Sequence, residues 1–132
     1  MIALDTNVLV RLLVEDDEAQ TARCKALVER IQAEGATAWV SDVVICEFVW
    51  VLSTSYKLGR GDVSDLVDAL LRARHLVYRD SARLRRALDR FRAGKGNFAD
   101  YLVREDAVEA GCSQLATFDG ALLNEAEFFI EP

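Results

Sequence analysis

The chain has 132 residues, 52% of them hydrophobic, which is enough to bury one sizeable core and too little for two ordinary domains. We therefore expect a single domain over 1–132. The net charge of −6 excludes a surface that is basic all over and attracts nucleic acid everywhere. The three widely spaced cysteines match neither a disulfide framework nor a zinc motif, so we expect small buried residues.

The N-terminus carries no basic segment followed by an uninterrupted apolar stretch, because Asp5 and Arg11 interrupt its apolar residues. A signal peptide and a membrane span are therefore not expected, and we predict a cytoplasmic protein. One proline and seven glycines leave little room for a linker between domains.

The first half of the chain alternates between short apolar runs and helical periodicity. A strand is predicted at 2–5, followed by helices at 7–14 and 18–35, the second of which ends at Gly35. A second strand is predicted at 37–41. Ser41 or Asp42 then caps a long apolar helix at 43–56.

The second half continues the alternation. After glycines at 59 and 61, a helix is predicted at 62–74 and a third strand at 75–79. Asp80 or Ser81 opens a basic helix, which the sequence AGKG closes. A further helix and two more strands complete the series, at 98–111, 113–118 and 127–131.

Strands separated by helices are typical of a parallel sheet, because parallel neighbours need crossover connections. The predicted class is α/β, a three-layer α/β/α sandwich with a central, mainly parallel five-stranded sheet. Ligands of such sheets bind at the carboxyl ends of the strands.

Four acids stand where this fold could bring them together. Asp5 follows the first predicted strand and Asp119 follows the fourth. Asp100 lies in the first turn of its helix, where the helix dipole favours negative charge. Glu47 has apolar residues three and four positions away on both sides, so we expect it on a buried face, where a carboxylate needs a cation or a hydrogen-bond network.

Each acid also has an ordinary structural explanation. Asp5, Asp100 and Asp119 all stand where a carboxylate caps a helix, and capping competes directly with a role in catalysis. The functional interpretation therefore depends on the four acids as a set.

Converging carboxylates repel one another unless a cation lies among them, and Mg²⁺ or Mn²⁺ with oxygen ligands fits this need. Such a site suits phosphodiester hydrolysis. His75 is the only histidine, which excludes catalysis by a histidine pair and a histidine-based zinc cluster. The sequence also contains no phosphate-binding glycine loop.

The segment 72–95 carries nine of the 16 basic residues and only two acids. Arginines on a helix often form a solvated face, and this explanation stays open beside a second one. An acidic protein that hydrolyses phosphodiesters needs local contacts to the phosphates of its substrate, and Arg85, Arg86 and Lys95 are the candidate residues for these contacts.

Four segments in order resemble the acidic motifs of the PIN-domain ribonucleases, in particular the VapC-type toxins of VapBC toxin–antitoxin pairs. They are ALDTNVLVRLL, SDVVICEFVWVL, NFADYLV and LATFDGAL, which contain Asp5, Glu47, Asp100 and Asp119 and together extend over nearly the whole chain. One departure is Asn97, where many relatives have an acid.

The resemblance implies a Mg²⁺-dependent endoribonuclease, a cognate antitoxin that silences it, and a homodimer that joins larger complexes with the antitoxin. Asp5 and Asp100 resemble the residues most directly bound to the metal, and Glu47 and Asp119 resemble those that complete the site. Thr6, Asn7 and Thr117 match polar residues that orient carboxylates or waters in the family.

Two alternatives remain open at this stage. A phosphatase or phosphotransferase of the haloacid dehalogenase type also places an aspartate after its first strand, although its usual second acid would fall at Asn7. A catalytically silent module that binds RNA or antitoxin would keep the same fold.

Overall fold

The computed structural model describes residues 1–132 and divides into two compact units, Met1–Ser81 and Ala82–Pro132. Each unit has its own helices and its own parallel strands. The expectation of a single domain over 1–132 stays a prediction.

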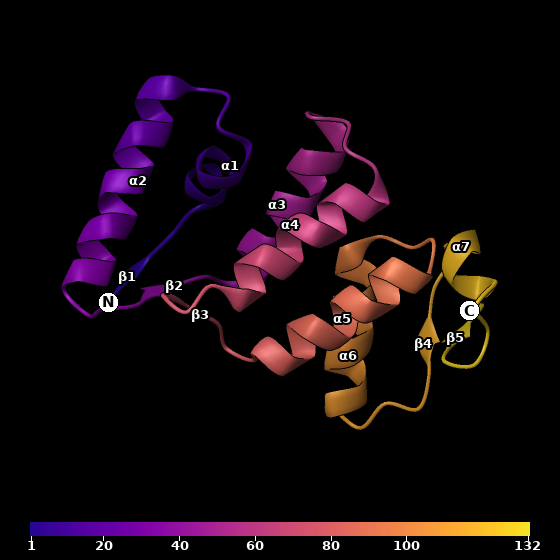
Figure 1. Ribbon diagram of the computed structural model, residues 1–132. Helices are drawn as coiled ribbons and strands as arrows, with labels where there is room; N and C mark the ends of the chain where they lie inside the picture. The colour runs from indigo at the N-terminus through magenta and orange to yellow at the C-terminus, as the bar shows by residue number, and fades with distance from the viewer. The chain divides into compact units, whose positions relative to one another are not determined.

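The first unit alternates strand and helix in the predicted order, with the ends of most elements shortened by a few residues. Its elements are β1 (Ile2–Ala3), α1 (Thr6–Val14), α2 (Glu18–Ala33), β2 (Ala38–Trp39), α3 (Asp42–Thr54), α4 (Arg60–Arg72) and β3 (Leu76–Val77). Helix α1 packs against α2 and α3, and α3 packs against α4 (Figure 1).

The second unit contains the rest of the predicted elements and one that the sequence did not predict. Its elements are α5 (Ser81–Ala93), whose first residue still belongs to the first unit, α6 (Phe98–Glu109), β4 (Leu115–Ala116), α7 (Gly120–Leu123) and β5 (Phe129–Ile130). The unpredicted element is α7, a single short turn in which no helical periodicity can develop.

The strands pair in parallel throughout, but they form two ladders. In the first unit the order is β1-β2-β3, with Ile2 opposite Ala38 and Ala38 opposite Leu76. In the second unit β4 pairs with β5, close to α7 and the C-terminus (Figure 1). The parallel α/β class is confirmed, whereas the single five-stranded sheet is not, because each two-residue strand makes ladder bonds only within its own unit.

Helix α2 ends as the sequence predicts. Gly35 has a φ of +64°, its N–H donates to the carbonyl of Gln32, and the N–H of Ala36 donates to that of Ile31. This pair of bonds satisfies carbonyls that the end of the helix leaves open, and glycine adopts the left-handed conformation at least cost. The turn leads the chain directly into β2.

The basic helix α5 is bound to the acidic side of α6. Glu105 is almost fully buried and accepts hydrogen bonds from Arg86 at 3.1 Å and from Arg90 at 3.0 Å. Arg83, also buried, contacts Glu109 at 3.1 Å. Three arginines of the basic segment therefore neutralise carboxylates of α6.

The three cysteines are free, but only Cys24 and Cys46 are partly buried, and Cys112 is exposed just after α6, so the expectation of buried cysteines is wrong for Cys112. None of the helices combines the length and the apolar character that crossing a membrane requires.

Replacing Glu105 with glutamine should destabilise the protein. The change leaves Arg86 and Arg90 without their shared carboxylate, and because their side chains are 49% and 43% exposed, water compensates in part. We expect a loss of about 2 kcal/mol in the free energy of unfolding, measured by urea denaturation.

The control for this change is Glu29→Gln on the exposed face of α2, which should stay within about 0.5 kcal/mol of the unmodified protein. An equal effect of the two substitutions would contradict the role given to Glu105.

Candidate active site

The predicted acids fall into two pairs, Asp5 and Glu47 in the first unit and Asp100 and Asp119 in the second. Within each unit, no group of three or more histidine, cysteine, aspartate or glutamate side chains forms a ready metal site.

Thr6 links the two acids of the first unit. Its backbone N–H donates to Asp5 Oδ1 at 2.8 Å, and its hydroxyl donates to Glu47 Oε2 at 2.7 Å. Thr6 is buried as the first residue of α1, so both bonds are made from a fixed position. A role of Thr6 in orienting these carboxylates for catalysis stays a prediction.

Asp5 occupies the N-cap of α1, one residue after the apolar Leu4. Leu4 is buried, and its N–H donates to the carbonyl of Trp39, which extends the pairing with β2. The strand therefore fixes the backbone directly before Asp5.

Glu47 lies on an exposed face of α3, contrary to the expectation that it is buried. Val43 and Trp50, four residues before it and three after it, are each 65% exposed. The core side of α3 is formed instead by Ile45, Phe48 and Leu52. Because α3 is apolar on more than one face, its periodicity alone could not identify the buried one.

The second pair shows a direct electrostatic interaction. The pKa of Asp100 is raised above its usual value of 3.8, chiefly by burial and further by the negative charge of Asp119, although a hydrogen bond from the backbone of Asn97 opposes the shift. The two carboxylates are therefore close enough to repel each other. In this environment the carboxyl group of Asp100 is stabilised either by binding a proton or by a nearby cation.

Both acids of this pair also cap helices. Asp100 is the third residue of α6, and its Oδ2 accepts from the N–H of Asn97 at 3.2 Å. Asp119 caps α7 by accepting from the N–H of Leu122 at 3.1 Å. Each of these hydrogen bonds uses one oxygen of a carboxylate that has two.

Thr117 supports Asp119 through the backbone. Its hydroxyl accepts from the N–H of Asp119 at 3.0 Å, and its own N–H donates to the carbonyl of Ile130 at 2.9 Å. Between them lies Phe118, an exposed ring that the sequence interpretation left without a role. The signal in the sequence that points to Phe118 is an aromatic residue directly beside an acid at the end of a strand.

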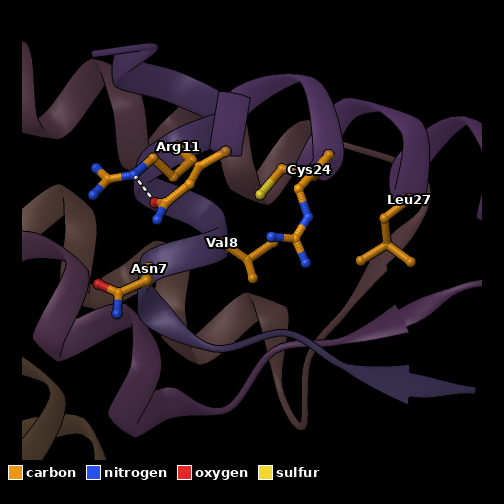
Figure 2. Close-up of a pocket in the computed structure, with 7 residues that line it drawn as sticks. Asn7, Val8, Arg11, Cys24 and Leu27 are labelled. Carbon is orange, nitrogen blue, oxygen red and sulfur yellow. Dashed lines mark hydrogen bonds between the residues drawn. The ribbon is translucent and has the colours of Figure 1, made fainter. Parts of the chain in front are cut away.

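Asn7 does not contact any of the four acids through a hydrogen bond in the structure. It lines a groove of about 400 Å³ between α1 and α2, together with Val8, Arg11, Cys24 and Leu27 (Figure 2). The dashed line in Figure 2 is the hydrogen bond from Arg11 Nε to Gln20 Oε1, at 2.6 Å.

The three basic candidates differ in their surroundings. Arg86 forms ion pairs with Glu105 at 3.1 Å and with Glu109 at 3.2 Å, so its charge is already engaged within the unit. All three side chains are exposed, those of Arg85 and Arg86 on α5 and that of Lys95 in the turn before α6.

Two comparisons with known proteins extend these observations. Residues 2–127 match the model of the PIN domain. A VapC ribonuclease from Aquifex aeolicus (strain VF5) is 26% identical over 118 residues, which cover 89% of this chain and 87% of that protein. Since the matched residues cover nearly the whole chain and include all four acids, the chain belongs to the PIN domain family.

Proposed function

We propose that this protein is a Mg²⁺-dependent endoribonuclease that acts as the toxin of a type II toxin–antitoxin system. Asp5, Glu47, Asp100 and Asp119 are the proposed catalytic and metal-binding acids. The observation that carries the proposal is the Asp100–Asp119 pair, in which burial and charge raise the pKa of Asp100 within a chain of the PIN family.

The chemistry of the donor groups fits a hard divalent cation. All four proposed ligands are carboxylates, and Mg²⁺ prefers oxygen ligands, with Mn²⁺ as a possible substitute. Repulsion between Asp100 and Asp119 adds a second reason, because a cation held by these carboxylates would offset that repulsion. When bound, the metal would supply the positive charge that phosphodiester hydrolysis requires as charge develops on the phosphate.

The protein's own contribution is to hold the acids in place before RNA binds. Thr6 fixes Asp5 and Glu47 through its backbone N–H and its hydroxyl. Helix caps restrict Asp100 and Asp119 in the same way. Rigid placement of this kind lowers the cost of ordering the groups at the moment of reaction.

Contacts to RNA are proposed for Arg85 and Lys95, whose side chains are exposed. The same proposal for Arg86 carries a cost, because binding a phosphate would weaken its ion pairs with Glu105 and Glu109. Asn7 is proposed as a supporting polar residue at the start of α1.

Several further properties belong to the same proposal. We infer a cognate antitoxin as the protein partner, in agreement with the name of the VapC ribonuclease that this chain resembles. We also propose that the protein is a homodimer and that it is cytoplasmic. Its proposed architecture is a single domain with a five-stranded sheet between two helical layers.

Purified protein, freed of any partner, should cleave total cellular RNA in the presence of Mg²⁺ or Mn²⁺. Cleavage should stop when a chelator is added. Asp5→Asn and Asp100→Asn should each lower the rate by about 100-fold or more, because each removes a negatively charged ligand. Cleavage is measured by gel electrophoresis of the RNA.

The matched control is Asp89→Asn, an exposed acid on α5, which should cleave at the unmodified rate. Cleavage that persists in chelator, or in both active-site variants, would refute the proposal. Hydrolysis of a small phosphate ester without RNA cleavage would indicate a phosphatase, and RNA or antitoxin binding without either reaction would indicate a silent module.

Thr6→Val should raise the Mg²⁺ concentration that cleavage requires, because valine has the shape of threonine but cannot donate a hydrogen bond to Glu47. We expect about 10-fold more Mg²⁺ to be needed for half-maximal cleavage. Thr6→Ser keeps the hydroxyl and should stay near the unmodified value. Equal metal requirements for the valine and serine variants would show that the hydrogen bond has no part in the site.

Asp100→Asn should stabilise the metal-free protein at neutral pH. A carboxylate whose pKa is raised in the folded state opposes folding when it is ionised, and this effect disappears as the pH falls through the raised pKa toward 3.8. The difference in Tm between Asp100→Asn and the unmodified protein, measured in chelator, should therefore shrink over that window. A variant that is less stable at neutral pH would contradict this assignment.

A further inference from the structure

Phe118 is the most exposed large apolar side chain of the protein, at 88% of its full accessible surface. It lies between β4 and α7, directly before Asp119. Single exposed apolar residues are common on protein surfaces, so exposure alone assigns no role. The surroundings of the ring make Phe118 different from the others.

The backbone on both sides of Phe118 is held by hydrogen bonds. On one side, Thr117 donates to the carbonyl of Ile130 at 2.9 Å. On the other, the N–H of Asp119 donates to the hydroxyl of Thr117 at 3.0 Å, and Asp119 accepts from Leu122 at 3.1 Å. The ring is therefore presented to solvent from an ordered turn, which reduces the entropy lost when a ligand packs on it.

The position of the ring relates it to the acids of the second unit. Phe118 precedes Asp119, whose charge acts on Asp100. When the phosphodiester bond that is cut lies at this site, the bases of the adjacent nucleotides are near Phe118, and a base that is not paired can turn toward an aromatic ring.

The charge of the protein explains why a stacking contact would be useful for binding RNA. With a net charge of −6, and with Arg83, Arg86 and Arg90 engaged by the acids of α6, the protein has limited electrostatic attraction for RNA. Stacking on an aromatic face supplies affinity that does not depend on charge, and every base has such a face.

We propose that Phe118 stacks on an unpaired nucleobase beside the phosphodiester bond that is cut. The inference rests on the proposed ribonuclease function and deepens it. Phe118 is a substrate-positioning residue in this proposal, and the acids remain the catalytic residues.

The test compares Phe118→Ala, Phe118→Leu and Phe118→Trp in steady-state cleavage of a single-stranded oligoribonucleotide. Alanine and leucine should raise KM by about 10-fold and change kcat little, because both remove the aromatic face. Tryptophan should restore KM. Val108→Ala, which shortens an exposed apolar side chain on α6, is the matched control and should leave KM unchanged.

Binding is measured separately, so that the two proposals can fail independently. Fluorescence anisotropy of the labelled oligoribonucleotide, with the protein in chelator, reports affinity without cleavage. Phe118→Ala should weaken binding by about 10-fold at every salt concentration, with the salt slope unchanged, because no ion pair is lost. This measurement remains informative if the unmodified protein cleaves no RNA.

Three results would overturn the inference. The first is unchanged binding and KM in Phe118→Ala. The second is full rescue by leucine, which would mean that apolar contact is enough and stacking is not involved. The third is unchanged RNA binding together with loss of self-association on size-exclusion chromatography, which would assign the ring to a protein interface.

Discussion

The first turn of a helix is the constraint on which the candidate site depends. The backbone N–H groups there have no partner within the helix, and a carboxylate at this position satisfies one of them while its charge interacts favourably with the helix dipole. Asp5, Asp100 and Asp119 all lie at such positions, at the starts of α1, α6 and α7. The same local structure that begins three helices therefore fixes three of the four acids.

The arginines of helix α5 have a structural role that differs from both explanations offered by the sequence. Its arginines were considered either as a solvated face or as an RNA contact, but Arg83, Arg86 and Arg90 bind the acids of α6. A buried carboxylate such as Glu105 is costly unless it is paired, so the basic character of α5 follows in part from the acidic character of α6. Local sequence around α5 does not reveal this, because the partners lie 15 or more residues away.

The parts of the fold that depend on short-range sequence patterns could be predicted. The stop of α2 at Gly35 and the cap of α3 at Ser41 both follow from residues within a few positions of the feature. The exposure of Glu47 was not predictable, because α3 is apolar on several faces and only tertiary packing chooses among them. The number of ladders was not predictable either, since two-residue strands carry too little pattern to define their neighbours.

For the candidate site, the sequence interpretation proposed four acids but treated capping and catalysis as competing explanations. The geometry removes this competition. A cap hydrogen bond engages one carboxylate oxygen, as at Asp100 Oδ2 and Asp119 Oδ1, and each carboxylate has a second oxygen and further lone pairs. Capping in fact suits metal binding, because an acid fixed by a helix loses little freedom when the cation arrives. An acid that caps a helix next to another acid is therefore a stronger candidate for a metal ligand than an acid on a mobile surface.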